Sequence, residues 1–362
     1  MGQQFELKLT DGFESAGNRV FGSVPMLHGL PALIEAAPIA NAGQAKPVKS
    51  KPALLPDDAT AEDAFRLTLT QCKWHIIANV PAVIETRQSE GLHQLRVGLR
   101  RLRVAFTAFG GEFRTPIMES IRLKAKVLSE QFAEARDLDV FLDNLFEPAA
   151  TANGAKEAFT VLRERALAAR ATAWDKAVIR VCSPSFSGFA RELSEALDAR
   201  IWSSGNRSKA HAAKGVMAFE APVRAVATRM LDYRLDHAKK RARHLEKLSD
   251  EQRHRLRIAL KKMRYTSDFY APLYPRRVTK KFLGRLSHMQ DVLGVLNDVA
   301  TARNILEKLV AVGDGGPLAT TEDLSFAAGI VYGWQLDRAN RIWENAKTCW
   351  KEFADSRPFW RA

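Results

Sequence analysis

The stretches HQLRVGLRRLR at residues 93–103 and HRLRIALKKMR at residues 254–264 decide the fold. They share His, Leu, Arg, Leu and Arg at the same offsets, and most other positions differ conservatively, such as Arg-Arg in one copy and Lys-Lys in the other. Leucines at spacings of three and four are typical of a helix with one buried face. The repeat therefore predicts two related helices, one in each half of the chain.

A second match follows each copy, with its spacing changed only by a small loop difference. Its residues are Arg122, Lys126, Gln131, Asp139 and Val140, which correspond in order to Lys281, Arg285, Gln290, Asp298 and Val299. A duplicated set of helical segments indicates two related helical bundles that pack as pseudo-symmetric halves. We expect a ligand site on or near the pseudo-twofold axis.

The rest of the chain predicts an all-α protein after residue 60, because apolar residues recur at helical spacing and Gly or Pro marks the breaks. The expected helices are 61–88 with a kink at Pro81, 91–110, 115–146, 155–178, 186–200, 217–247, 250–271, 277–312 and 322–355. Residues 41–58 are rich in Pro, Ala and Lys and predict an extended linker. The expected domains are an N-terminal segment with linker at 1–60, a first bundle at 61–205 and a second bundle at 206–362.

Each repeated helix carries a basic stripe within about 80° of arc. The stripes comprise His93, Arg96, Arg100 and Arg103 in the first copy, and His254, Arg257, Lys261 and Arg264 in the second. Apolar residues flank each stripe on both sides: Leu95, Leu99 and Leu102 against Val97 and Val104, and Leu256, Leu260 and Met263 against Ile258 and Tyr265. Two apolar edges predict that the cations line a groove between packed helices, whereas Arg101 and Lys262 lie off this face and are expected to be more exposed.

The stripes need an anionic partner from elsewhere, since no acidic residue occurs within 91–111 or 252–267. The following helices offer further cations at Arg122, Lys124, Lys126, Lys281 and Arg285, and the chain has a formal net charge of +14. Guanidinium groups suit phosphate oxygens geometrically, and a polyanion would also favour the protonated form of a neighbouring histidine. The charge alone leaves nucleic acid, anionic lipid and polyphosphate open.

The sequence lacks the motifs that are typical of several other functional classes. The sequence has no Walker A loop, HExxH, GxSxG or Rossmann glycine pattern, no apolar run that could span a membrane, and three distant cysteines without a CxxC pair. We therefore predict no catalytic residues, no metal site and no cofactor. Three aspartates, Asp137, Asp139 and Asp298, could either orient the arginine side chains or form ordinary ion pairs. The core is expected to contain Trp334, Trp343, Trp350 and Trp360.

Both stripe segments, extended to HQLRVGLRRLRVAFTAF and HRLRIALKKMRYTSDFY, resemble a CHAD domain, the conserved histidine α-helical domain, as do ARDLDVFL, VLNDVATA and the RPFW ending. The resemblance covers roughly residues 60–362. It implies two four-helix bundles around a basic central pore that binds inorganic polyphosphate without hydrolysing it. It further implies association with polyphosphate granules in a bacterial cytoplasm. Lys261 departs from Arg100 of the first copy and loses a bidentate donor while keeping the charge.

Such domains often follow a CYTH domain, a β-tunnel that processes triphosphate. The FELKL segment at 5–9 and the linker resemble the junction after a CYTH domain, so residues 1–60 are interpreted as a possible remnant of one. This segment is too short for a barrel, and it offers only Glu6, Asp11, Glu14 and Glu35 as metal-binding carboxylates. The expected function is non-catalytic polyphosphate binding, and the alternative is general binding of nucleic acid or other polyanions. A third possibility is a histidine phosphoacceptor or a phosphatase. Polyphosphate needs no aromatic stacking, and aromatic residues are scarce among the stripe cations, so nucleic acid is the less favoured partner.

Overall fold

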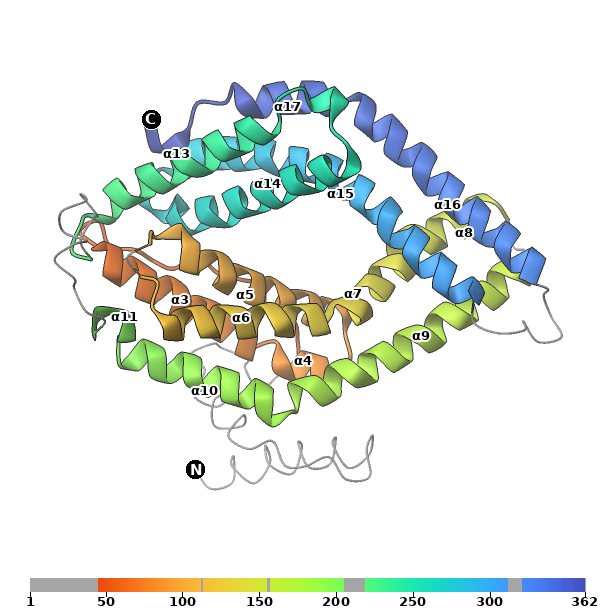
Figure 1. Cartoon of the computed structure of the whole chain (residues 1–362), viewed down its shortest axis with the longest axis horizontal. Helices are drawn as coiled ribbons and strands as arrows, with labels where there is room; N and C mark the ends of the chain where they lie inside the picture. Colours follow the sequence, from red (N-terminus) through yellow and green to blue (C-terminus); the bar gives the residue numbers. More distant parts are fainter. Residues whose placement is uncertain (1–44, 112, 155–156, 205–218, 312–320, 362) are drawn as a thin grey trace. The chain divides into compact units, whose positions relative to one another are not determined.

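A computed structural model describes residues 45–111, 113–154, 157–204, 219–311 and 321–361 (Figure 1). Helices dominate these residues, and the described part of the chain contains no strand, only an isolated antiparallel bridge between Thr60 and Pro222. The all-α prediction is confirmed. Among the same residues, no helix is both long and apolar enough to cross a bilayer.

Polar caps set the starts of several helices. The Thr60 hydroxyl accepts a hydrogen bond from the Asp63 amide at 3.1 Å, and the Asp63 carboxylate accepts one from the Thr60 amide at 3.3 Å, at the start of α3 (Ala61–Ile77). Ser249 and Gln252 form the same reciprocal pair at the start of α14 (Asp250–Tyr270). These pairs stabilise the helix ends because they satisfy amide groups that have no partner within the first turn.

The chain divides into two compact units. Unit 1 runs to Arg136 and resumes over Ala173–Pro222, whereas unit 2 comprises Asp137–Thr172 and the residues from Val223 onward. These units differ from the predicted halves 61–205 and 206–362, because Asp137–Thr172 packs with the second half of the chain. The two four-helix bundles and the pore between them stay a prediction.

In unit 1, α3 packs against α5, and α10 packs against both α3 and α6. The helices of this unit besides α3 are α4 (Val80–Ile84), α5 (Ser89–Ala108), α6 (Pro116–Gln131), α10 (Pro184–Asp198) and α11 (Ile201–Ser204). The Phe65 ring lies at the centre of an aromatic core, with ring centroids of Phe113 and Trp202 at 4.3 and 5.2 Å. Gly98 brings α5 close to α3, since a Cβ at this position would lie 2.7 Å from the Ile76 side chain.

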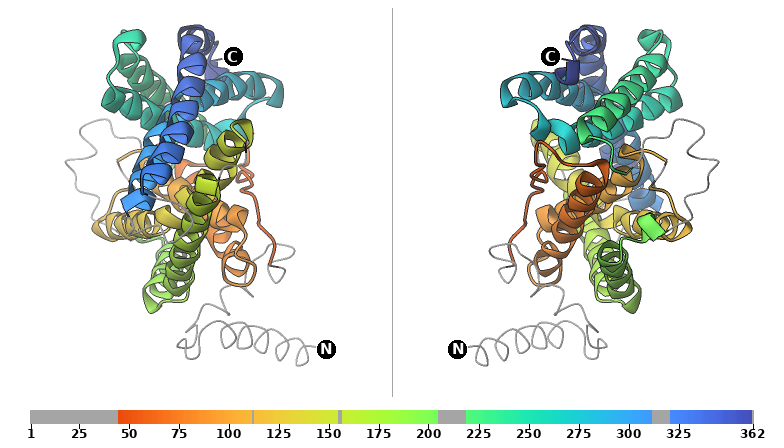
Figure 2. Two further views of the ribbon diagram at one scale, coloured as in Figure 1. Left: turned by 90° about the vertical axis from the view of Figure 1, so that its right-hand side faces the viewer. Right: turned by 90° about the vertical axis from the view of Figure 1, so that its left-hand side faces the viewer.

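In unit 2, α13 packs against α14, α14 against α15, and α15 against both α16 and α17 (Figures 1 and 2). These helices span Val223–Arg241 (α13), Arg276–Ala311 (α15), Thr321–Glu344 (α16) and Ala346–Ala354 (α17). The unit also contains the π-helix η1 (Phe141–Phe146), α8 (Glu147–Ala152) and the 3-10 helices η2 (Leu245–Lys247), η3 (Ala271–Leu273) and η5 (Phe359–Arg361). Two helices, α7 (Ala133–Val140) and α9 (Glu157–Val181), have residues in both units. A core that includes Phe141, Phe146, Leu306 and Val331 joins η1 to α15 and α16.

Four predicted helices are interrupted in the structure. The helix expected at 217–247 ends at Arg241, and the separate 3-10 helix η2 follows the left-handed residue His244. The helix expected at 61–88 is split into α3 and α4, and Pro81 lies in the first turn of α4 rather than at a kink. The helix expected at 115–146 becomes α6, α7 and η1, and Pro148 follows directly in the first turn of α8. Proline lacks the amide that an uninterrupted α-helix needs, and this favours a local change of hydrogen-bond pattern before it. The helix expected at 322–355 ends at Glu344 and restarts at Ala346.

The predicted linker at 41–58 is described from residue 45, contains no helix and docks on unit 1. The Val48 amide donates to the Asn79 side-chain oxygen, and the Asn79 amide nitrogen donates back to the Val48 carbonyl, each at 2.9 Å. The predicted strand at 5–9, the proposed CYTH remnant and its acidic residues Glu6, Asp11, Glu14 and Glu35 lie outside the described residues.

Candidate functional site

The predicted stripes lie on α5 in unit 1 and on α14 in unit 2. The leucine edge of each stripe is buried as expected: Leu95, Leu99 and Leu102 on α5, and Leu256, Leu260 and Met263 on α14. The other edge differs between the helices. Val97 on α5 is half-buried and its counterpart Ile258 on α14 is 40% exposed, while Val104 is buried and its counterpart Tyr265 is half-buried. Burial of both edges was therefore wrong for α14, because the packing of α14 on α13 and α15 leaves the Ile258 side open.

In unit 1, the first stripe belongs to a larger group of cations, which we call the α5 cluster. Its members are His93, Arg96, Arg100, Arg103, Arg122 and Arg136. Burial and the positive charge of Arg136 lower the pKa of His93, while Glu90 one turn earlier opposes them. Burial also lowers the pKa of Arg103, and the nearby Arg122 adds to this effect against Glu130. Such mutual destabilisation of charged groups is the signature of a concentrated positive potential.

Arg96 is the most deeply placed member of the α5 cluster. Only 6% of this residue is exposed, and its Nη1 donates a hydrogen bond to the Ser129 carbonyl in the last turn of α6. A cation at the carbonyl end of a helix is favourable because the helix dipole places partial negative charge there. Arg96 therefore joins α5 to α6 as well as adding to the positive charge.

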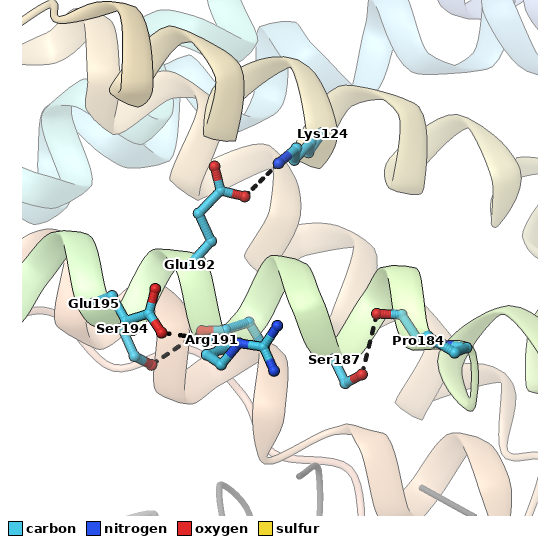
Figure 3. A network of polar contacts seen from close by, with 8 residues as sticks. Lys124, Pro184, Ser187, Arg191, Glu192, Ser194 and Glu195 are labelled. Carbon is cyan, nitrogen blue, oxygen red and sulfur yellow. Dashed lines mark hydrogen bonds and ion pairs between the residues drawn. The ribbon is translucent and has the colours of Figure 1, made fainter. Parts of the chain in front are cut away.

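The cations expected on α6 are partly neutralised. Arg122 pairs with Glu119 on the same helix, and Lys126 lies 3.8 Å from Glu130. Lys124 points from α6 to Glu192 on α10 and forms an ion pair with it, as Figure 3 shows. Lys124 therefore contributes mainly to the packing of α10 against α6, and Arg122 is the α6 cation that acts directly on Arg103.

In unit 2, the second stripe meets carboxylates. We call Arg257, Lys261, Arg264 and Arg338 the α14 cluster. Arg264 forms an ion pair with Asp268 at 3.1 Å. Arg257 donates a hydrogen bond to the Asn297 side chain at 3.2 Å.

Asp298 is the second carboxylate of this region. Burial raises its pKa and Asp137 adds to the effect, whereas Arg257, Lys261 and Arg338 lower it. All three cations therefore interact electrostatically with the same half-buried carboxylate. Asp139, its counterpart in the repeat, is 1% exposed and pairs with Arg170 at 2.6 Å.

Three predicted site residues of unit 2 lie outside the α14 cluster. His254 and Lys281 are exposed, and Arg285 donates a hydrogen bond to the Ser356 hydroxyl at 2.9 Å. Their predicted role as ligand-binding residues stays a prediction.

The expected exposure of Arg101 was wrong, although Lys262 is exposed as predicted. Arg101 is 6% exposed and lies close to Cys72 and His75 of α3. It shares its helix face with Gln94, which bonds to the His75 ring at 3.0 Å, and with Gly98, which admits the close approach of α3. The spacing of Gln94, Gly98 and Arg101 at four and three residues marks this face in the sequence.

Two further cations were missed as site candidates. Arg136 on α7 acts on His93, and Arg338 on α16 acts on Asp298. Neither residue belongs to a matched position of the repeat, and both are distant in sequence from the stripes. Only the three-dimensional packing brings them to these clusters.

The remaining predictions concern metals, thiols and tryptophans. In the part of the chain that the structure describes, no group of three His, Cys, Asp or Glu side chains could hold a metal ion. Burial raises the pKa of both Cys72 and Cys182 to about 11, so these thiols are protonated at neutral pH. Trp360 is buried as predicted, whereas Trp334, Trp343 and Trp350 are only partly buried.

A comparison with known protein families matches residues 68–307 to the CHAD domain, which is more than half of the chain. The chain belongs to the CHAD family. It is similar to the crystal structure of the CHAD domain from the plant Ricinus communis, with 27% sequence identity and a TM-score of 0.69, covering 86% of this chain and 98% of the plant one.

A second solved structure, PptA from Streptomyces chartreusis, shares the fold with a TM-score of 0.59 at 16% identity. The match covers 81% of this chain and all of the Streptomyces chain. A comparison with curated proteins gave no significant match. The predicted membership of the CHAD family is thus confirmed, and the all-α fold agrees with both solved structures.

Proposed function

We propose that this CHAD protein binds inorganic polyphosphate through the α5 and α14 clusters without hydrolysing it. The observation that carries the proposal is the α5 cluster, in which arginines from α5, α6 and α7 depress the pKa of His93 or of one another. Holding like charges together costs free energy, and a bound polyanion offsets that cost. Arginine forks give a phosphate chain several charge-assisted hydrogen bonds.

Polyphosphate suits these clusters better than nucleic acid does. It carries dense negative charge and no bases, so it requires cations but no aromatic platform. The stripes themselves offer cations on an aliphatic helix surface, with Tyr265 as the nearest aromatic residue in sequence. The alternative is a general polyanion site, which would accept nucleic acid equally well at these clusters.

The proposal assigns a binding role rather than a catalytic one. Phosphoryl transfer usually requires carboxylates that hold magnesium beside the phosphates. In the described structure, Asp268 and Asp298 lie beside Arg264 and Lys261 and serve to balance their charge. The proposal also includes association with polyphosphate granules in the cytoplasm, as expected from the family.

The decisive test is a titration with long-chain polyphosphate at two salt concentrations, with released phosphate assayed in parallel. We expect tight binding that weakens as salt rises, because condensed counterions are released on binding. The double variant Arg100→Glu with Lys261→Glu should abolish binding and leave the helical circular dichroism spectrum unchanged. Unchanged affinity of this variant would refute the assignment.

Two further readings belong to the same experiment. Displacement of polyphosphate by single-stranded RNA or duplex DNA at equal phosphate concentration would make the clusters general polyanion sites. Phosphate released from triphosphate or polyphosphate in the presence of magnesium or manganese would show an activity that contradicts the binding role.

A further inference from the structure

Helix α13 carries an aromatic pair, the exposed Tyr233 and the half-buried His237, that the polyphosphate proposal does not use. The Tyr233 and His237 rings are nearly parallel, with an interplanar angle of 19° and ring centroids 6.0 Å apart. Tyr233 is 55% exposed, which is unusual for a large aromatic side chain in a folded unit. The pair therefore offers a flat surface to solvent on one side of unit 2.

Cations surround this aromatic pair. Burial lowers the pKa of His237, followed by the positive charges of four side chains, in the order Arg241, Arg234, Lys262 and Lys240. The Nε of Arg241 donates a hydrogen bond to the His237 Nε2 at 2.8 Å, which requires a neutral imidazole with a free lone pair. The Arg234 guanidinium lies 5.6 Å from the centre of the Tyr233 ring. The rings are thus part of a positively charged surface.

The carboxylates of α13 serve contacts with η5. Asp232 accepts hydrogen bonds from Trp360 at 2.7 Å and pairs with Arg361 at 2.9 Å. Asp236 also contributes to stabilising the charge of Arg361. These two acids are therefore engaged with Arg361, and the charged groups that act on His237 are all cations.

Stacked rings beside several cations are the combination that binds single-stranded nucleic acid. A base stacks on an aromatic ring, while Lys and Arg contact the neighbouring phosphates. Inorganic polyphosphate has no group that could use the rings, and a duplex keeps its bases stacked inside. An intrahelical Tyr–His contact would stabilise α13 alone, but that role needs neither the exposure of Tyr233 nor the four cations.

We propose that the α13 face, made of Tyr233, His237, Lys240, Arg241 and Lys262, binds single-stranded nucleic acid with one base stacked on Tyr233. This surface shares no residue with the α14 cluster, although its Lys262 follows Lys261 on α14, and α13 has no residue in the polyphosphate proposal. The two proposals therefore make independent claims about different residues of the same chain.

The test uses the full chain and a fluorescently labelled fifteen-nucleotide oligouridylate, whose binding is followed by anisotropy. Tyr233→Ala should weaken RNA binding about tenfold, because base stacking on an aromatic side chain is lost. Tyr233→Phe keeps the ring and should bind like the parent protein. Phe326→Ala removes another exposed aromatic residue, on α16, and serves as the matched control.

A second variant tests the cations separately from the rings. The triple change Lys240→Ala, Arg241→Ala and Lys262→Ala should reduce the slope of log affinity against log salt by about two, since each single-strand phosphate contact contributes about 0.7. An oligomer of abasic sites with the same length should bind the parent protein about as weakly as the uridylate binds Tyr233→Ala. Both results would support the proposal.

The affinity of the Tyr233→Ala variant for long-chain polyphosphate distinguishes this proposal from the polyphosphate-binding proposal. We expect it to be unchanged, and a loss equal to that for RNA would overturn the stacking role of Tyr233. RNA affinity unchanged in both the Tyr233→Ala and the triple variant, with thermal unfolding also unchanged, would overturn the α13 face as the site. Photocrosslinking of a 4-thiouridine oligomer to the peptide that contains Tyr233 would support it directly.

Discussion

Helices α5 and α14 repeat one pattern of cations in two different electrostatic surroundings. Four residues after Arg264, α14 carries Asp268, which forms an ion pair with it. The equivalent position after Arg103 on α5 is Thr107, whose hydroxyl donates to the Val104 carbonyl instead. The repeat therefore preserves the cations but not the carboxylate that offsets them.

The surroundings amplify this difference. Asp298 lies close enough to Lys261 to be stabilised by it, whereas in unit 1 burial, Arg122 and Arg100 lower the pKa of Arg103 and outweigh the opposing effect of Glu130. Two copies of one motif can therefore differ in how much of their positive charge is offset by neighbouring carboxylates. We expect unit 1 to supply most of the affinity for a polyanion.

The largest expected effect comes from reversing charge in one unit at a time. Arg100→Glu with Arg103→Glu should weaken polyphosphate binding about 100-fold, whereas Lys261→Glu with Arg264→Glu should weaken it about tenfold, because carboxylates already offset the second pair. A titration at constant salt measures both. Equal losses would show that the repeated pattern, rather than its carboxylate neighbours, determines affinity.

The packing of the two helices gives the next test. Gly98 of α5 corresponds to Ala259 of α14, and a Cβ on Gly98 would lie within 2.7 Å of Ile76. Gly98→Ala should therefore destabilise the protein by about 1–3 kcal/mol through overpacking. The reverse change, Ala259→Gly, should cost only about 1 kcal/mol from helix propensity and a lost methyl group. Chemical denaturation measures both, and a neutral Gly98→Ala would contradict the close approach of α3.

Exchanging the carboxylate between the units sharpens the comparison directly. Thr107→Asp places an acid beside Arg103 and should weaken polyphosphate binding about fivefold, while Asp268→Thr frees Arg264 and should strengthen binding about threefold. Thr107→Asn introduces a side chain of the same shape as aspartate without its charge and serves as the control. Changes of the same sign in the two variants would show that the ion pair of Arg264 positions it for binding.

The smallest expected effect is a dependence on pH that involves His93. Its pKa lies below the usual 6.5 because of burial and then Arg136, so the ring is neutral in the free protein at neutral pH. A bound polyanion raises that pKa, so binding takes up a proton and affinity increases as pH falls. We expect a gain of about threefold from about pH 7.5 to about pH 6.

Isothermal titration in two buffers of different ionisation enthalpy measures this proton uptake. His93→Gln should remove it while keeping a side chain that can form hydrogen bonds. Proton uptake that persists in His93→Gln would assign the effect to another group.

The repeat predicted much of the fold. The leucines of 93–103 and 254–264 place two helices correctly, since a buried face imposes helical spacing on the sequence. Capping residues also mark the starts of α3 and α14 in the sequence. The breaks at Ile77 and Gln131 were missed, because the apolar spacing continues across each of them; Pro81 lies close to the first break, and no proline lies near the second.

The candidate site was less predictable. The stripes gave the cations on α5 and α14, but Arg136 and Arg338 come from other helices and have no local sequence signal. Arg101 was assigned to the surface from its charge, although the glycine beside it allows α3 to cover it. The division into units also depends on long-range packing, which moves Asp137–Thr172 to unit 2.

The contact between Val48 and Asn79 has a consequence for hydrogen exchange. Both the amide and the carbonyl of Val48 bond to one side chain at the end of α3, within a stretch that has no helix or strand. An amide held in this way exchanges with deuterium only when the contact opens. Val48 should therefore exchange more slowly than its neighbours, and Asn79→Ala should raise its rate to theirs while the amides of α5 keep their protection.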